Sequence, residues 1–476
     1  MPVCHLTADA IRAAESATGD LLTGGTLMQR AAHAVAQAVV AELDARGGCY
    51  GRRVGLVVGA GDNGGDALFA GGRLARRGAD VEAVLLAPEK AHDAGLAYFR
   101  RAGGRVVDAL AARVDVVIDG VVGIGGRGPL RPPAAAAFAA LEPGTCVVSV
   151  DLPSGVDADT GVVHDPAVAA DITVTFGVRR NAHLLAAPQC GRIIVADIGI
   201  RADDAVPPGT LWSLTDAEIG RRWPVPGPHD DKYTQGVVGI IAGSHRYPGA
   251  AVLCAGAAVT TTSGMTRYVG SAHAEVVGRW PEVVAVPDLA DAGRVQAWVV
   301  GPGGGTDDAA LATLRTVLAT DVPVLVDADA LTLLAGHPEL VVGRGAPTLL
   351  TPHAGEFGRL RGTRLPDDRL AAVTALAADW GVTVLLKGRI TLVAGPDGIV
   401  YGNDAGSSWA ATAGAGDVLS GIAGALLAAG LEPRIAGAAA ARVHAHAAAR
   451  AARGAPIGAS NLLAALREAI RAIRVS

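Results

Sequence analysis

Lysine is scarce in this 476-residue chain, which carries it at only three of its 41 basic positions, Lys90, Lys232 and Lys387. A genome rich in G and C explains the preference for arginine, and it also suits the 64 glycines. Under such a bias, a lysine that persists is a candidate for a chemical role.

Cysteine is also rare, with five residues scattered along the chain and no CxxC pair. This spacing excludes a metal site built on paired cysteines and argues against a disulfide framework. An odd number of cysteines in a long chain favours a reducing compartment, so we expect a cytoplasmic protein. Residues 1–15 contain acidic side chains and no apolar run, unlike a signal peptide.

Two further absences limit the partners. No stretch of about 20 apolar residues is free of charges, so no membrane span is expected. The net charge of −5 gives no reason to expect binding to nucleic acid.

Apolar residues, by contrast, make up half of the chain, and its length predicts two or three domains. Short apolar runs such as Val54–Val58 and Cys146–Val150 alternate with helical patterns, and a second series starts at Val237–Ile241. Residues 203–232 between them hold five prolines and read as a linker with one short helix, Asp216–Arg222. The alternation predicts α/β domains whose ligands bind beyond the carboxyl ends of the strands.

The strongest motif is the glycine-rich turn Gly414-Ala415-Gly416-Asp417, which leads directly into an apolar helix. Glycines let backbone N–H groups converge on an anion, and a helix N-terminus adds partial positive charge. The ordinary role of Asp417 at this position is a helix cap. Beside an anion cradle, the same carboxylate can accept a hydroxyl proton during phosphoryl transfer.

Further polar loops follow the strands of the second series. Lys387 follows Val382–Leu386, the glycine run 301–305 follows Trp298–Val300, and the segment 351–356 with His353 follows Thr348–Leu350. Because the loops after parallel strands share one edge of the sheet, we expect them to converge on one crevice with Asp417.

This combination resembles the ribokinase-like dehydratase domain that repairs hydrated nicotinamide cofactors. The matching segments are GSHRYPGAA (243–251), GPGGG (301–305), LTPHAGE (350–356), LLKGR (385–389) and WAATAGAGDVLSG (409–421). The resemblance implies phosphorylation of the hydrate hydroxyl by ADP or ATP with Mg²⁺, followed by elimination of phosphate. It implies that Asp417 activates the hydroxyl. It assigns the nucleotide to Lys387, Gly388, Arg389, Ile390, Thr391, Gly414 and Gly416, and the hydrate to Ala250, Gly303, Gly305, His353 and Asp417.

In the N-terminal half, polar residues beside glycines follow three strand patterns. Residues 59–66, GAGDNGGD, follow the first, and Asp119 and Asp151 follow the next two. Each aspartate alone is more often a turn or cap residue, but three such strand ends together indicate a site. Oxygen donors without cysteine or histidine suit a hard cation rather than zinc.

These residues resemble the epimerase domain that is often fused to that dehydratase. The resemblance implies interconversion of the R and S epimers of hydrated NADH and NADPH, with Asp151 as a catalytic residue. It implies potassium at Asn63, Asp119 and Ser154. It assigns the hydrate to Asp62, Asn63, Gly64, Gly65, Asp66, Gly123, Ile124, Gly125, Gly126, Arg127, Gly128, Pro129 and Asp151.

Taken together, the resemblances predict an α/β chain with a Rossmann-like three-layer αβα domain over 1–212, a linker over 213–231 and a ribokinase-like αβα domain over 232–476. They imply a bifunctional enzyme that acts on hydrated NADH or NADPH and forms a homo-oligomer. The alternative is a ribokinase-like kinase of a small alcohol or vitamin precursor with a non-catalytic N-terminal scaffold. His444 and His446, two residues apart on one predicted helix, are interpreted as surface or packing residues.

Overall fold

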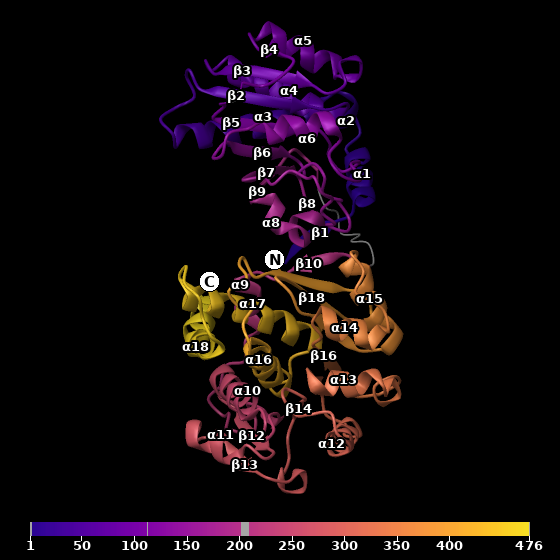
Figure 1. The fold of residues 1–476 in the computed structure, drawn as a ribbon, viewed down its shortest axis with the longest axis vertical. Helices are drawn as coiled ribbons and strands as arrows, with labels where there is room; N and C mark the ends of the chain where they lie inside the picture. Colours follow the sequence, from indigo (N-terminus) through magenta and orange to yellow (C-terminus); the bar gives the residue numbers. More distant parts are fainter. Residues whose placement is uncertain (1, 112, 201–208, 476) are drawn as a thin grey trace. The chain divides into compact units, whose positions relative to one another are not determined.

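The computed structural model describes residues 2–111, 113–200 and 209–475. The chain divides into two compact units, Cys4–Thr210 and Leu211–Ser476, with Met1–Val3 grouped with the second (Figure 1). The expected linker therefore contains ordered elements: β10 (Leu211–Ser213) pairs with β19 (Val400–Asp404), and α9 (Asp216–Arg222) packs on α18 (Ala459–Val475).

The first unit is built on a parallel sheet with the strand order β4-β3-β2-β5-β6-β7-β9. Every pair of neighbouring strands in this sheet is parallel, so all the carboxyl ends lie at one edge. The strands are β2 (Arg53–Val58), β3 (Asp80–Leu85), β4 (Arg105–Val106), β5 (Val116–Gly120), β6 (Cys146–Val150), β7 (Ile172–Phe176) and β9 (Arg192–Ala196).

Successive residues of a strand point to opposite faces of the sheet, and apolar residues lie on both faces here. Helices therefore cover both faces. Val54, Leu56 and Val58 pack into a core with α3 (Thr26–Asp44), α4 (Asp62–Ala75) and α5 (Asp93–Arg101). Val57 and Val117 face the other way, toward α6 (Pro132–Ala139). The predicted three-layer αβα architecture is confirmed for this unit.

Short elements complete the first unit. They are α1 (Ala8–Ser16), α2 (Asp20–Thr23), α7 (Ala182–Leu185), α8 (Ala187–Cys190), and the parallel pair β1 (Val3–Leu6) and β8 (Arg179–Arg180). The sequence predicted a helix from Ala67, whereas α4 begins at Asp62, directly after Gly61 at φ 89°. The glycine-rich segment 62–66 is therefore the first turn of a helix, not a loop before it.

The second unit has the strand order β13-β12-β11-β14-β15-β16-β17-β18-β19-β10. The strands from β13 to β17 are parallel to one another. β18 is antiparallel to both of its neighbours, β17 and β19. The strands are β11 (Val237–Ile241), β12 (Met265–Val269), β13 (Val284–Val286), β14 (Ala297–Val300), β15 (Val324–Val326), β16 (Thr348–Leu350), β17 (Thr383–Leu386) and β18 (Ile390–Ala394).

Two groups of helices flank this sheet (Figure 1). On one side lie α10 (Pro248–Thr261), α11 (His273–Arg279), α16 (Ala415–Ala428), α17 (Pro433–Ala452) and α18, which form the largest buried cluster. On the other lie α12 (Asp308–Leu318), α13 (Asp329–Ala335), α14 (Ala354–Arg361) and α15 (Arg369–Trp380). The second unit is thus also a three-layer αβα fold. Over the described residues, no helix combines the length and apolarity needed to cross a bilayer.

Candidate active sites

The loops that the sequence predicted to converge in the second unit do follow neighbouring parallel strands. β14, β15 and β16 end at Val300, Val326 and Leu350, which the register aligns in the sheet, and β17 continues two residues past that level to Leu386. The glycine run 301–305, Asp327, the segment 351–356 and Lys387 therefore lie at one edge. The sequence analysis missed only the second of these, Asp327.

The glycine-rich turn begins helix α16. Gly414 is the N-cap at φ 83°, a left-handed conformation that favours glycine, and it makes no side-chain capping bond. The N–H of Ala415 donates to the carbonyl of Thr412, whereas the N–H groups of Gly416 and Asp417 have no acceptor among the described residues and are available to an anion. Asp417 lies inside that first turn, at its third residue, so it is not the helix cap.

The carboxyl of Asp417 is partly buried and has no direct partner: among the described residues it makes no hydrogen bond or ion pair. Burial, assisted by the charges of Asp327 and Asp329, raises its pKa to about 6, although Lys387 opposes the shift. A carboxylate with a pKa near neutrality is suited to accept a proton from a hydroxyl.

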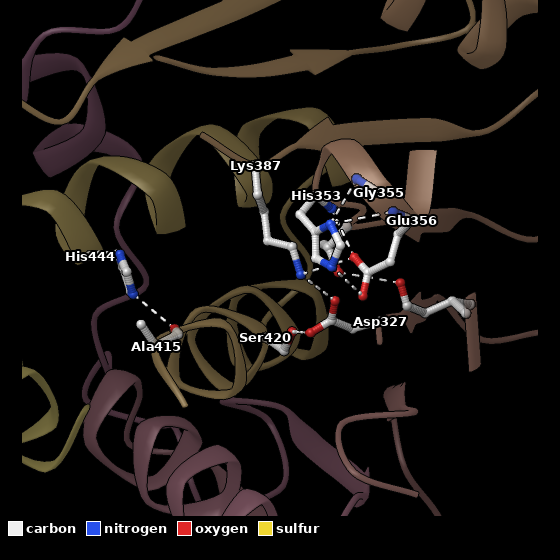
Figure 2. A network of polar contacts seen from close by, with 10 residues as sticks. Asp327, His353, Gly355, Glu356, Lys387, Ala415, Ser420 and His444 are labelled. Atoms are coloured by element: carbon white, nitrogen blue, oxygen red, sulfur yellow. Dashed lines mark hydrogen bonds and ion pairs between the residues drawn. The ribbon is translucent and has the colours of Figure 1, made fainter. Parts of the chain in front are cut away.

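Lys387 lies between two carboxylates (Figure 2). Its Nζ donates to Oδ1 of Asp327 at 2.7 Å and lies 3.6 Å from Oε2 of Glu356. Burial opposes its charge, but these two carboxylates raise its pKa, so the ammonium is charged. A Cβ on Gly416 would lie 3.7 Å from Nζ, which places the ammonium beside the glycine-rich turn.

A cavity of about 450 Å³ opens next to this turn. Its lining includes most of the residues predicted for the nucleotide and also His353. They are His353, Lys387, Gly388, Arg389, Thr391 and Gly416. Ile390 is buried in β18, and Gly414 forms the turn itself without lining the cavity. Arg389 is held by Asp404, with Nε 3.3 Å from Oδ1.

The residues predicted to bind the hydrate lie in two places. Ala250, in the first turn of α10, is next to Gly303, where an added Cβ would lie 2.9 Å from that of Ala250. The N–H of Gly305 donates to Asp329. His353 caps α14, and its Nδ1 accepts from the N–H groups of Gly355 and Glu356.

His444, interpreted from the sequence as a surface or packing residue, packs on the glycine-rich turn and also lies at the cavity. It lines the cavity and donates from Nε2 to the carbonyl of Ala415 at 2.9 Å, since a carbonyl only accepts (Figure 2). Burial lowers its pKa to about 4, so the ring is neutral. His446, by contrast, contacts Asp216 at 3.0 Å. The two histidines differ in their partners: that of His444 belongs to the glycine-rich turn, 29 residues earlier in the chain.

In the first unit, the two predicted hydrate segments meet at Asn63. Residues 62–66 form the first turn of α4, and a Cβ on Gly123 would lie 2.5 Å from Oδ1 of Asn63. Nδ2 of Asn63 donates to the carbonyl of Val150, which precedes Asp151. The segments 62–66 and 123–129 and the end of β6 therefore share one edge.

Asp119 is completely buried and is held by hydroxyl and backbone donors. Its Oδ1 accepts from Oγ of Ser154 at 2.6 Å, and its Oδ2 accepts from Oγ of Ser149 at 2.9 Å. Burial raises the pKa of Asp119 even though these donors lower it. The structure thus brings Asp119 and Ser154 into direct contact, close to the loop that covers Asn63.

Asp151 is paired with a residue that the sequence analysis missed. Its Oδ1 lies 2.9 Å from Nη2 of Arg180, and both side chains are almost fully buried. Thr175 also donates to Oδ1, and Nε2 of His183 donates to the backbone carbonyl of Asp151. Asp151 has φ 65°, an uncommon conformation for a residue other than glycine. Arg180 lies 29 residues after Asp151 in the chain, so the two side chains meet only in the folded protein.

Two other acids lie near Asp151. Asp66 is buried and its Oδ1 has no hydrogen-bond partner in the described part of the chain. Burial, followed by the charges of Asp62 and Asp151, raises its pKa well above the ordinary value. Burial likewise raises the pKa of Glu15 on α1. The first unit therefore places a carboxylate paired with arginine near a carboxyl that favours its neutral form.

No cluster of three or more acidic, histidine or cysteine side chains suited to a metal is found in the described residues. The residues predicted for potassium, Asn63, Asp119 and Ser154, include one charged group. Amide, carboxylate and hydroxyl oxygens together suit a hard cation of low charge.

Two family models match the chain, one in each unit. Residues 24–182 match a family described as "YjeF-related protein N-terminus", and residues 238–471 match a family described as "NAD(P)H-hydrate dehydratase".

Curated relatives match over nearly the whole length. The bifunctional NAD(P)H-hydrate repair enzyme Nnr of Mycobacterium tuberculosis H37Rv is 58% identical over 90% of this chain and 89% of its own. The protein of the same name from Mycobacterium leprae is 56% identical over 98% of both chains. A ribokinase-like superfamily protein of Enterococcus faecalis, 23% identical, matches 57% of this chain and 99% of its own with a TM-score of 0.50, which supports the fold of the second unit.

Proposed function

This chain belongs to the family of bifunctional NAD(P)H-hydrate repair enzymes, and on that premise we propose which residues carry its two activities. The second unit dehydrates NADH or NADPH hydrate at the expense of ADP or ATP. The first unit interconverts the R and S epimers, so that both reach the dehydratase as the S form.

The observation that supports the dehydratase assignment most strongly is Asp417, a partly buried, unpaired carboxylate with a pKa of about 6 on the first turn of α16. It accepts the proton of the hydrate hydroxyl as that oxygen attacks the terminal phosphorus of the nucleotide. The bridging P–O bond breaks, and AMP leaves from ADP or ADP leaves from ATP. The phosphate ester then loses inorganic phosphate and a proton from the adjacent carbon, which restores the double bond.

The cavity beside this turn holds the nucleotide. Lys387 supplies a positive charge at the edge of the turn, and the free N–H groups of Gly416 and Asp417 bind the phosphates. Mg²⁺ enters with the nucleotide as part of the substrate, bound mainly by phosphate oxygens. Ala250, Gly303, Gly305 and His353 bind the hydrate, and His353 also lines the nucleotide cavity.

The epimerase centres on Asp151, held by Arg180 at the end of β6. Segments 62–66 and 123–129 bind the hydrate. Asn63, Asp119 and Ser154 bind potassium, which would add positive charge for the anionic substrate. A requirement for potassium is tested by measuring epimerisation in potassium and in choline chloride at equal ionic strength. Equal rates in the two salts would count against the ion.

The decisive experiment for the dehydratase is the return of NADH absorbance from its hydrate. Purified protein with ADP or ATP, Mg²⁺ and K⁺ should consume the S epimer only when nucleotide is present. It should also consume the R epimer, more slowly if epimerisation limits the rate. Hydrate left untouched under these conditions rejects the proposal. A stable phosphate ester in place of NADH would identify a kinase instead.

We further propose that the enzyme is a cytoplasmic homo-oligomer. Five free cysteines are compatible with a reducing compartment. Light scattering of the purified chain tests the oligomeric state.

A further inference from the structure

We propose that Asp327 is a positioning residue of the dehydratase, which holds the ammonium of Lys387 at the nucleotide and away from the carboxylate of Asp417. The inference rests on the proposed function of the second unit. Neither the motifs nor the cavity lining includes Asp327, because it lies beneath the site at the end of β15.

Asp327 is 1% exposed and has both carboxylate oxygens engaged. Oδ1 accepts from Nζ of Lys387 at 2.7 Å, and Oδ2 accepts from Oγ of Ser420 at 2.7 Å (Figure 2). Ser420 is one turn after Asp417 on α16. One buried carboxylate thus joins the cation beside the nucleotide to the helix that carries the base.

The backbone around Asp327 is built to keep it there. Ala328 has φ 52°, a left-handed conformation that costs energy for a residue with a Cβ. Gly301 closes on this turn so tightly that an added Cβ would lie 2.0 Å from the carbonyl of Asp327. The same turn directs Asp329 to the N–H of Gly305. A strained turn that aims two acids at two parts of one site indicates function rather than packing.

The charge of Lys387 explains why a carboxylate such as Asp327 must bind it. An ammonium that paired directly with Asp417 would lower the pKa of that carboxyl by about one to three units and so weaken the base. With Asp327 and Glu356 as its partners, Lys387 remains charged for the nucleotide while Asp417 stays unpaired. The charged or titratable groups around Asp417 are Asp327, Lys387, Asp329 and Cys254.

Asp327→Asn tests this division of roles. The asparagine is isosteric and its amide can still meet Lys387 and Ser420, so the fold is preserved while the charge is lost. We expect the acid limb of the kcat–pH profile to move down by about one pH unit. We also expect kcat on the plateau to fall about tenfold or more and KM for the nucleotide to rise. Asp216→Asn is the matched control, since Asp216 also accepts from a cation, Arg442, and from His446.

A purely structural role would reduce the folded fraction and leave the midpoint and KM unchanged, and that result would overturn the inference. If Asp327→Asn does not fold, Lys387→Gln replaces it. Loss of the ammonium should then move the midpoint upward, because Asp327 would act on Asp417 without compensation. A midpoint that stays in place or moves downward would overturn the inference.

Carboxyl-carbon NMR separates this inference from the proposed function. The Asp417 resonance, assigned by its loss in Asp417→Asn, should titrate near pH 6 in the wild type and lower in Asp327→Asn, whether or not the protein turns over hydrate. No turnover by the wild type would reject the proposed function. Identical titrations in the two proteins would reject the role of Asp327.

Discussion

Each unit places an aspartate at the ligand edge of a similar three-layer fold, buried in the first unit and partly buried in the second, but the charges around the two aspartates are arranged in opposite ways. Asp151 of the first unit faces Arg180 directly, at 2.9 Å. Asp417 of the second unit has a lysine nearby, yet that lysine is bound to Asp327. The pairing fixes one carboxylate in place, whereas the diversion of the cation leaves the other free to take a proton near neutral pH. A buried acid is therefore assigned a role by its neighbours more than by its position in the fold.

The largest expected effect is on Asp417, where the comparison predicts a change confined to one activity. Asp417→Asn removes the proton acceptor and should lower dehydratase turnover by about 10²–10⁴-fold. Nucleotide binding, measured by calorimetry, should persist because the cavity is intact. Epimerisation by the same protein is the internal control. Undiminished turnover would mean that Asp417 is not the base and has only a structural role in the first turn of α16.

Asp151→Asn is the reciprocal change. It leaves the buried Arg180 without its carboxylate and should lower epimerisation about 10²-fold while dehydration of the S epimer continues. Thr175→Val, which removes only a hydroxyl donor to the same oxygen, should have a smaller effect. If neither variant changes the rate, Asp151 has no role in epimerisation. A first unit that is only a scaffold would show no epimerisation even in the wild type.

The fold was largely predictable from the sequence because its signals are local. β6, β11 and β16 have the predicted limits, since each is a short apolar run between turn residues. Among the elements that had not been predicted are β12, α11, α13, α14 and α18. The start of α4 was placed too late because the glycines of 62–65 suggested a loop. In the structure they allow close packing: a Cβ on Gly64 would lie 2.3 Å from the carbonyl of Gly59.

The candidate sites were predictable only where a motif carries them. Lys387, Gly416 and His353 belong to recognisable segments and line one cavity. The residues that were not predicted contact partners far away in the chain. Asp327 binds Lys387, 60 positions away, while Arg180 binds Asp151 and His444 binds Ala415, each 29 positions away. Such contacts depend on tertiary packing, and no spacing along the chain predicts them.

The raised pKa of Asp417 gives the second unit a pH dependence. The base must be ionised, and its pKa is about 6, so dehydratase kcat should fall as the pH drops through 6. At pH 5 about one tenth of the carboxyl is ionised, which predicts a rate about tenfold below the plateau. Rates from pH 5 to 8 under saturating nucleotide test this. A profile that stays flat to pH 5 would mean that Asp417 is not the titrating base.

The smallest expected effect concerns His444, and it tests whether the turn must be held in place from outside. His444→Phe keeps a ring but removes the hydrogen bond to Ala415, a loss of about 1 kcal/mol. If that bond orients the first turn of α16 toward phosphate, KM for the nucleotide should rise about fivefold, with little change in kcat. His446→Phe is the matched control, because His446 bonds Asp216 and does not line the cavity. An equal rise in both variants would mean that α17 affects the site only through stability. A rise in His444→Phe alone would show that the anion cradle depends on a neutral histidine.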